Sequence, residues 1–264
     1  MKPLFWLAIL SFYISTVLFA QALPPVTQLA FKPGEKLTYK VYYNLFSLQA
    51  GTATFEVKDA LKKVGIRDCY NIVGTGKTTE ACDLFFPVRD HYESYIDTTA
   101  LLPWRFVRIV NEGGFKFDDF VRFDQYSKTA TSKKNKETKY PLTPQTHDVI
   151  SALYYFRTID WSKAEINQAF TVDLFLDEKI HQNKITYLGK ETIKTDLGKF
   201  SCFKVRPVLI TGNVFKENAE MTIWVTDDAN RIPIRIESEI VVGKVKADLI
   251  DYVNIRNEFS AKVR

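Results

Sequence analysis

The sequence predicts a mainly β protein: a long, curled antiparallel sheet that forms an incomplete barrel, with one amphipathic helix packed on it. Apolar and polar residues alternate along most of the chain, which is the period of a strand with one buried face. Successive strand-like runs are joined by turns too short for a crossover helix, so neighbouring strands must pair antiparallel. About a dozen strands are too many for a flat sheet, because twist accumulates until the sheet curls or splits. A two-layer β sandwich is therefore the alternative architecture.

Strand-like runs fill the first half of the chain, and a tight hairpin joins two of them. Gly113 and Gly114 supply the positive φ that such a turn requires. A longer connection, over residues 44–51, joins the first two runs. The runs cover residues 37–43, 53–57, 88–96, 102–110 and 115–123.

The second half repeats this pattern after a single helical segment. Residues 148–160 have Val149, Leu153 and Phe156 at helical spacing, and Thr146 is predicted to cap the helix start. Residues 140–146, just before this helix, are the best candidate for a subdivision of an otherwise single domain over residues 23–264. The strand-like runs cover residues 170–176, 180–187, 223–225, 232–240 and 245–253, with turns at 177–178 and 227–230.

The first residues predict a signal peptide over residues 1–22. Lys2 precedes an apolar run over residues 4–20, and Ala20 and Ala22 are both suitable last residues of a leader. An uncut membrane anchor is the alternative, because the run is only slightly shorter than the roughly 17 to 25 residues that span a bilayer. No cysteine stands directly after the run, where a lipid would be attached, so we expect a periplasmic protein that is not a lipoprotein. Loss of the leader would lower the formal net charge from +5 to +4, a mildly basic balance that predicts no nucleic-acid partner.

The three cysteines leave two interpretations open. Cys69 and Cys202 both lie in strand-like runs and could form a disulfide across the sheet, which would leave Cys82 unpaired. Alternatively, all three are small buried apolar residues. A chain of this length buries enough surface to fold without a disulfide.

Motif inspection predicts no catalytic residue, no cofactor and no metal ion. The segment Gly74 to Thr78 is similar to the end of a phosphate-binding loop, but Asn71 stands where that loop needs a glycine, so we interpret the segment as a strand end. His91 and Glu93 share one strand face, yet His147 and His181 lie in unrelated segments. We therefore interpret His91 and Glu93 as a solvated strand face.

Aromatic and basic residues are the remaining candidates for binding. The lysine-rich stretch over residues 128–139 is typical of a solvated hairpin tip, or of a contact with an anionic headgroup. Most aromatic side chains belong in a core, but some are expected to line a cavity on the concave face of the curled sheet. The predicted ligand-binding residues are Phe55, Trp104, Phe106 and Trp224, with Arg89 or Arg105 near a polar headgroup.

Several segments together resemble a family of exported Gram-negative proteins known as domain of unknown function 3108. The resemblance extends from about Phe31 to Tyr252 and implies location and fold more than activity, because that family has no assigned function. The architecture is also similar to that of periplasmic carriers that move lipoproteins between membranes, an analogy without any shared motif. The family resemblance is carried by Gly34 to Tyr39 with Ala50 and Gly51, Phe86 to Asp90, Tyr92 to Asp97, Asp148 to Tyr155, Gly198 to Val205, and Trp224 to Asp228 with Ile232 and Pro233.

Three hypotheses of function follow. The first is a non-catalytic periplasmic carrier whose partner is a hydrophobic or amphipathic, lipid-like small molecule. The second is a structural or assembly partner of an envelope protein or a membrane surface, which predicts a packed interior and an exposed apolar patch of several hundred Å². The third is an enzyme acting on polysaccharide, which predicts two carboxylates about 5 to 9 Å apart in an open groove.

Overall fold

The computed structural model describes residues 23–43, 48–208, 220–240 and 243–263, and most of them belong to one large sheet. The predicted signal peptide lies outside the described residues. Two short helices, α1 (Glu80–Asp83) and α2 (Val149–Phe156), and a 3-10 turn at Trp161–Lys163 interrupt the strands. The strands are β1 (Lys36–Tyr43), β2 (Leu48–Val57), β3 (Lys62–Val64), β4 (Arg67–Thr78), β5 (Arg89–Asp97), β6 (Pro103–Glu112), β7 (Phe115–Asp124), β8 (Thr129–Ser132), β9 (Tyr140–Pro141), β10 (Thr146–His147), β11 (Ala169–Leu176), β12 (Lys179–Thr195), β13 (Gly198–Pro207), β14 (Met221–Thr226), β15 (Pro233–Glu239), β16 (Lys244–Val253) and β17 (Lys262–Val263).

Strand pairing is continuous from one end of the sheet to the other. From β10 the ladder runs through β11, β12, β13, β14, β15 and β16 to β1, and then through β2, β4, β5, β6, β7 and β8 to β9. Among the described strands, only β10 and β11 pair in parallel. The predicted curled, mainly antiparallel sheet is therefore confirmed, and the two-layer sandwich is not formed.

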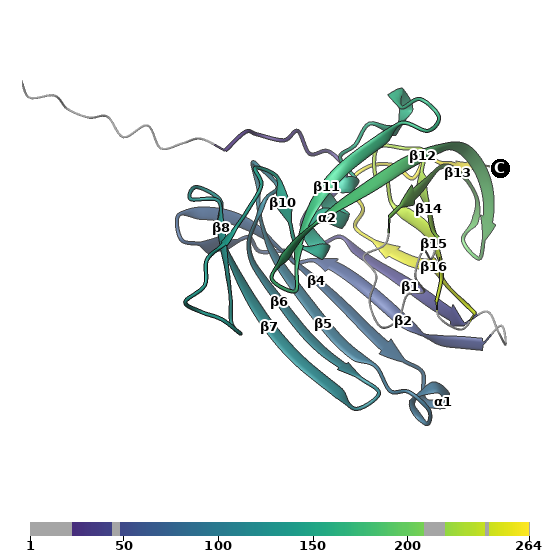
Figure 1. The fold of residues 1–264 in the computed structure, drawn as a ribbon. Coiled ribbons are helices and arrows are strands. Elements are labelled where there is room, and N and C mark those ends of the chain that lie inside the picture. The colour runs from purple at the N-terminus through teal and green to yellow at the C-terminus, as the bar shows by residue number, and fades with distance from the viewer. Residues whose placement is uncertain (1–22, 44–47, 209–219, 241–242, 264) are drawn as a thin grey trace, which may run out of the picture.

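The two ends of the sheet approach each other without pairing. End strands β9 and β10 are adjacent in the chain and lie at the two ends of the segment 140–146 that the sequence offers as a boundary. The Thr143 hydroxyl donates to Asp173 Oδ2 on β11 at 2.7 Å, and the Tyr140 ring lies 5.8 Å from that of Phe175. These side-chain contacts hold the two ends of the sheet near each other. Because the described end strands do not pair with each other, the barrel stays open (Figure 1).

Helix α2 (Val149–Phe156) lies on the concave side of the sheet (Figure 1). Its N-cap is Asp148, whose Oδ1 accepts the backbone N–H groups of Ile150 and Ser151 at 2.8 Å. The Ser94 hydroxyl on β5 donates to Asp148 Oδ2 at 2.6 Å and fixes the helix start to the sheet. The predicted helix is thus confirmed in place but is shorter, and Thr146 is the wrong cap because it belongs to β10 and bonds Thr143 instead.

Buried side chains form three clusters, two of which include residues of α2. The first joins α2 to β4–β7 and includes Phe31, Ile72, Phe106, Ile150 and Tyr154. The second lies between β1 and β13–β16, and the third joins the end of α2 to β11–β14. Core therefore occupies the concave side, where a ligand cavity was expected.

The predicted turns and connections are mostly confirmed. Gly113 and Gly114 have φ values of +56° and +92° and join β6 to β7. Asp177 and Glu178 turn between β11 and β12 with φ values of +49° and +63°. Strand β2 begins at Leu48, so the connection after β1 is shorter than expected.

The three cysteines are free thiols. Cys69 on β4 and Cys202 on β13 are buried, but five strands lie between β4 and β13 in the ladder, so the two thiols are not brought together. Within the described ranges, no helix is long and apolar enough to span a bilayer.

Candidate binding groove on the outer face of β6 and β7

Alternation along β6 and β7 sends two sets of side chains to opposite faces. Phe106 and Val121 are register partners, and both pack in the cluster that contains α2. Arg105 and Arg122 pair one position further along, so they point away from α2. Two adjoining hollows of about 620 and 640 Å³ open on this outer face and share Phe120 and Arg122 in their lining. We call these hollows together the outer groove.

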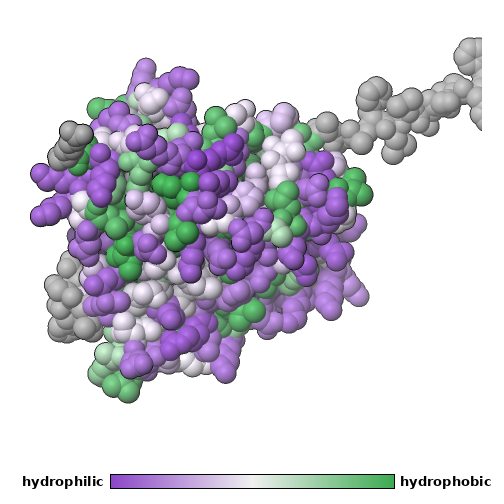
Figure 2. Space-filling model, turned by 180° about the vertical axis from the view of Figure 1, so that it is seen from behind, coloured by the Kyte–Doolittle hydropathy of each residue, from purple (hydrophilic) through white to green (hydrophobic). Residues whose placement is uncertain are grey.

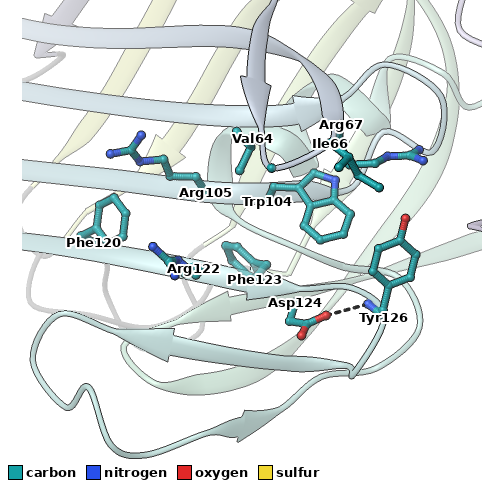
Figure 3. A pocket seen from close by; sticks show the side chains of 11 residues that line it. Val64, Ile66, Arg67, Trp104, Arg105, Phe120, Arg122, Phe123, Asp124 and Tyr126 are labelled. Carbon is teal, nitrogen blue, oxygen red and sulfur yellow. Dashed lines mark hydrogen bonds between the residues drawn. The ribbon is translucent and has the colours of Figure 1, made fainter.

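Two arginines face each other across the strands in the middle of the outer groove. Like charges directly opposite each other destabilise a sheet. The Arg105 guanidinium lies 4.8 Å from the centroid of the Phe120 ring and 5.2 Å from that of Tyr95. Within the described part of the chain, neither Arg105 nor Arg122 forms an ion pair. An anionic group between them would offset their repulsion, and Figure 3 shows both beside Phe120.

The other end of the first hollow is apolar. Trp104 and Tyr126 stand together there with a ring separation of 5.4 Å (Figure 3). The Trp104 indole donates to Asp97 Oδ2 at 3.2 Å, which fixes its orientation. Arg67 forms two hydrogen bonds with Asp97, at 2.5 and 2.9 Å. Burial alone would raise the pKa of Asp97, but the bonds from Arg67 and from backbone N–H groups lower it, so this pair is neutral overall.

The second hollow ends at the lysine-rich hairpin after β8. Lys133 and Lys136 line it together with Val107 and Ile109. Lys133 forms an ion pair with Asp118, which neutralises one of the two lysines. The predicted solvated tip therefore also borders a candidate site.

The Asp124 carboxylate in the lining of the outer groove accepts hydrogen bonds from the backbone. Backbone N–H groups of Ser127 and Tyr126 donate to Asp124 at 3.0 Å, and the bond from Ser127 contributes most to lowering the pKa of Asp124. A glycosidase acid needs a raised pKa instead. Burial and the neighbouring Asp90 carboxyl raise the pKa of Glu112, but Glu112 lies outside the groove lining.

His91 and Glu93 are joined by a local hydrogen bond on β5. His91 Nε2 lies 2.8 Å from Glu93 Oε1, and the Tyr95 hydroxyl donates to Glu93 Oε2 at 2.9 Å. Burial opposes ionisation of Glu93, but these bonds lower its pKa. In the described ranges, no group of three or more His, Cys, Asp and Glu side chains could hold a metal ion. Gly74 to Thr78 form the end of β4, a strand rather than a phosphate loop.

The structure brings two of the six predicted binding residues together. Trp104 and Arg105 both line the first hollow of the outer groove. Phe106 is buried in the cluster that contains α2, and Phe55 packs against the same cluster. Phe55 and Phe106 thus lie on the concave face of the sheet, which α2 covers. We therefore correct the location of the candidate site from the concave to the outer side.

Trp224 and Arg89 lie elsewhere. The Trp224 indole belongs to the second cluster and donates to Glu191 Oε2 at 3.1 Å. Arg89 forms hydrogen bonds of 3.0 and 2.5 Å with the Asp83 carboxylate next to α1. Neither residue lines the outer groove.

Arg122 and Phe120 are groove residues that the sequence analysis did not select. The sequence contains the information needed to find them, because a two-residue turn at Gly113 and Gly114 sets the register of the whole β6–β7 hairpin. That register pairs residue 105 with residue 122 and residue 107 with residue 120.

The arrangement of the sheet invites comparison with known proteins. The family model described as "Protein of unknown function (DUF3108)" matches residues 38–250. The chain belongs to this family. Among curated proteins, none matches this DUF3108 chain.

Solved structures are similar to this DUF3108 chain to different degrees. One is a β-barrel-like protein of the domain of unknown function DUF1849 from Brucella abortus, with a TM-score of 0.55 and 10% sequence identity, covering 86% of this chain and 100% of that one. Another is a candidate lipoprotein from Parabacteroides distasonis ATCC 8503, with a TM-score of 0.38 and 11% identity over 88% of this chain and 100% of that one. At such low identity, the first likeness shows the fold alone.

Proposed function

We propose that the chain is a non-catalytic periplasmic binding or carrier module for an amphipathic, lipid-like ligand with an anionic headgroup. The observation that carries this proposal is the opposed pair Arg105 and Arg122 beside the aromatic wall of the outer groove. Neither arginine forms an ion pair in the described chain, although the charge of Arg105 helps to lower the pKa of Glu93 on β5. Arginine binds phosphate and carboxylate oxygens in a bidentate manner. The headgroup would lie between the guanidinium groups, and the apolar chain would lie along Phe120 and Trp104.

Apolar contact supplies the second part of the binding energy. Burial of one methylene group contributes about 0.8 kcal/mol, so a chain of about a dozen carbons that is half covered could contribute roughly 5 kcal/mol before ordering costs. An open groove covers only one side of such a chain. We therefore expect binding in the micromolar range rather than tight sequestration.

The test is a titration of the mature protein with dodecyl phosphate below its critical micelle concentration, followed by tryptophan fluorescence and calorimetry. Dodecyl maltoside has the same chain with a neutral head, and inorganic phosphate has the charge without the chain. The Arg105→Gln/Arg122→Gln variant should bind dodecyl phosphate at least tenfold more weakly. Arg206 on β13 forms an exposed ion pair with Glu220, and the control variant Arg206→Gln should bind dodecyl phosphate as the parent does.

Two results would refute the proposal. One is equal affinity for dodecyl phosphate and dodecyl maltoside, and the other is unchanged affinity in the double arginine variant. Native mass spectrometry of protein purified from the periplasm without detergent, followed by organic extraction, would then identify the physiological ligand class.

A specific observation also favours the second hypothesis, an assembly partner in the envelope. The concave side is packed, and an apolar corner near α1 is exposed, as that hypothesis predicts. What this corner contacts is therefore a separate question from the ligand of the groove.

A further inference from the structure

One corner of the molecule exposes large apolar side chains. Leu84, Phe85 and Phe86 follow α1 (Glu80–Asp83) and are 83%, 88% and 53% exposed, and Phe115 in the β6–β7 turn is 61% exposed. We call these four residues the apolar tip. It lies at the free ends of the β4–β5 and β6–β7 hairpins (Figure 1), and the α1 end of the molecule is hydrophobic at the lower left of Figure 2.

The backbone beneath the apolar tip is braced. The N–H groups of Phe85 and Phe86 donate to the Cys82 carbonyl at 3.0 and 2.9 Å. The Gly113 N–H donates to the Pro87 carbonyl at 2.8 Å and joins the two hairpins. The side chains are thus held outward by an ordered turn, and their exposure is a fixed feature of the surface.

The Phe86 ring adds a second link between the hairpins. A Cβ atom at Gly113 would lie only 2.2 Å from this ring, so the ring rests directly on the glycine backbone. Phe115 follows this turn and stacks on Phe117 with a ring separation of 6.4 Å. The two hairpin ends therefore present one joined apolar surface.

Size and shape decide what this surface contacts. An aromatic residue buries about 150 to 250 Å² when fully covered, so four partly exposed side chains offer only a few hundred Å². A stable protein interface buries about 800 Å² on each partner. The apolar tip also projects from the hairpin ends, so a protein partner would need a matching pocket. A lipid bilayer needs none, and aromatic side chains are favoured at its interface with water.

Charged side chains of both signs surround the apolar tip. Exposed Lys77 and Lys116 lie on the two hairpins that carry the tip, and neither forms an ion pair within the described chain. Of the acidic residues of α1, Asp83 is neutralised by Arg89, and Glu80 is exposed. Glu112 pairs with Phe115 at the β6–β7 turn, and burial and the neighbouring Asp90 carboxyl raise its pKa, which disfavours its negative charge. Each basic side chain near an anionic membrane surface favours binding.

We propose that the apolar tip inserts into the interfacial region of a lipid bilayer that contains anionic lipid. Strands β6 and β7 run from this tip to the outer groove. Arg122 lies seven positions after Phe115, so the arginine pair would stand roughly 23 Å from the inserted end, at about 3.3 Å per residue. The tip and the groove are different surfaces, so membrane insertion can hold or fail independently of the ligand proposed for the groove.

The test measures binding of the mature chain to vesicles of phosphatidylethanolamine and phosphatidylglycerol by co-sedimentation, with pure phosphatidylcholine vesicles for comparison. We expect binding that is stronger on the anionic vesicles. Leu84→Ser/Phe85→Ser changes the two most exposed tip residues and should lower the partition coefficient at least tenfold. The matched control, Ile166→Ser/Val208→Ser, changes two exposed apolar residues away from the tip and should bind as the parent does.

Insertion itself is measured by the fluorescence quenching of a tryptophan introduced at the apolar tip. Fluorescence of Phe85→Trp should be quenched by lipids with brominated acyl chains beyond the quenching of the parent, and Ile166→Trp should show no such increase. Failure of the parent to bind either vesicle, or equal binding by Leu84→Ser/Phe85→Ser, would overturn the proposal. A photo-cross-linker at position 85 that captures a protein in cells, without vesicle binding, would overturn it in favour of a protein partner.

Discussion

The buried ion pair between Glu35 and Arg157 gives the sharpest test of how the fold is held. Arg157 is the C-cap of α2, directly after Phe156. The side chains of Arg157 and Glu35 are only 1% and 0% exposed to solvent. The guanidinium donates to the two Glu35 carboxylate oxygens at 2.6 and 3.0 Å, and also to the carbonyls of Ala30 and Asn230. Glu35→Gln keeps the shape but removes the charge and one acceptor. An uncompensated guanidinium then stays buried.

We expect Glu35→Gln to lower the free energy of unfolding by about 3 to 5 kcal/mol, the usual effect of removing one partner of a buried pair. That is a large part of the roughly 5 to 15 kcal/mol that stabilises a typical domain. The assay is urea unfolding followed by tryptophan fluorescence and far-UV circular dichroism. Asp68→Asn is the matched control, because its pair with Lys63 at 3.1 Å is exposed and should contribute about 0 to 1 kcal/mol.

A double variant separates charge from packing. Glu35→Leu/Arg157→Met removes both charges and should recover much of the stability that Glu35→Gln loses, because no unpaired charge stays buried. If Glu35→Gln unfolds at the same urea concentration as Asp68→Asn, the pair does not hold α2 as the geometry indicates.

Two further predictions concern titratable groups. Burial raises the pKa of Asp148 to about 6, above its value in an unfolded chain, so the contribution of the protonated form to stability is lost as the pH rises through 6. Asp148→Asn keeps a capping side chain and should gain stability relative to the parent between pH 4 and pH 7 in urea unfolding; a constant difference across that range would contradict the assignment. Burial also raises the pKa values of Cys69 and Cys202 to about 12, whereas Cys82 is partly exposed. We expect one thiol of the native protein to react rapidly with a disulfide reagent at pH 8, and Cys82→Ser to abolish that phase, so two rapid thiols would count against the described packing.

The pairing of strands within each hairpin can be predicted from residues that lie close together in the sequence. Alternation at Leu37 to Tyr43 and the turn at Gly113 and Gly114 depend on residues close in the chain, so the sequence predicts them without knowledge of the rest. The register of that hairpin even implies the contact between positions 105 and 122. The helix start was misassigned because Thr146 and Asp148 are both capping residues, and the choice depends on Ser94, which donates to Asp148 from a distant strand.

The sequence by itself determined a mainly β chain, its hairpins, its single long helical segment and its family resemblance, because these depend on periodicity and turn chemistry over short distances. Only the tertiary structure decided which face of the sheet α2 covers. That choice rests on contacts such as Glu35 with Arg157, which are 122 residues apart. Period-two alternation divides the side chains of a strand into two sets, but it does not say which set becomes core. The packing of α2 assigns Phe106 to the core and leaves Arg105 and Arg122 on the outer surface.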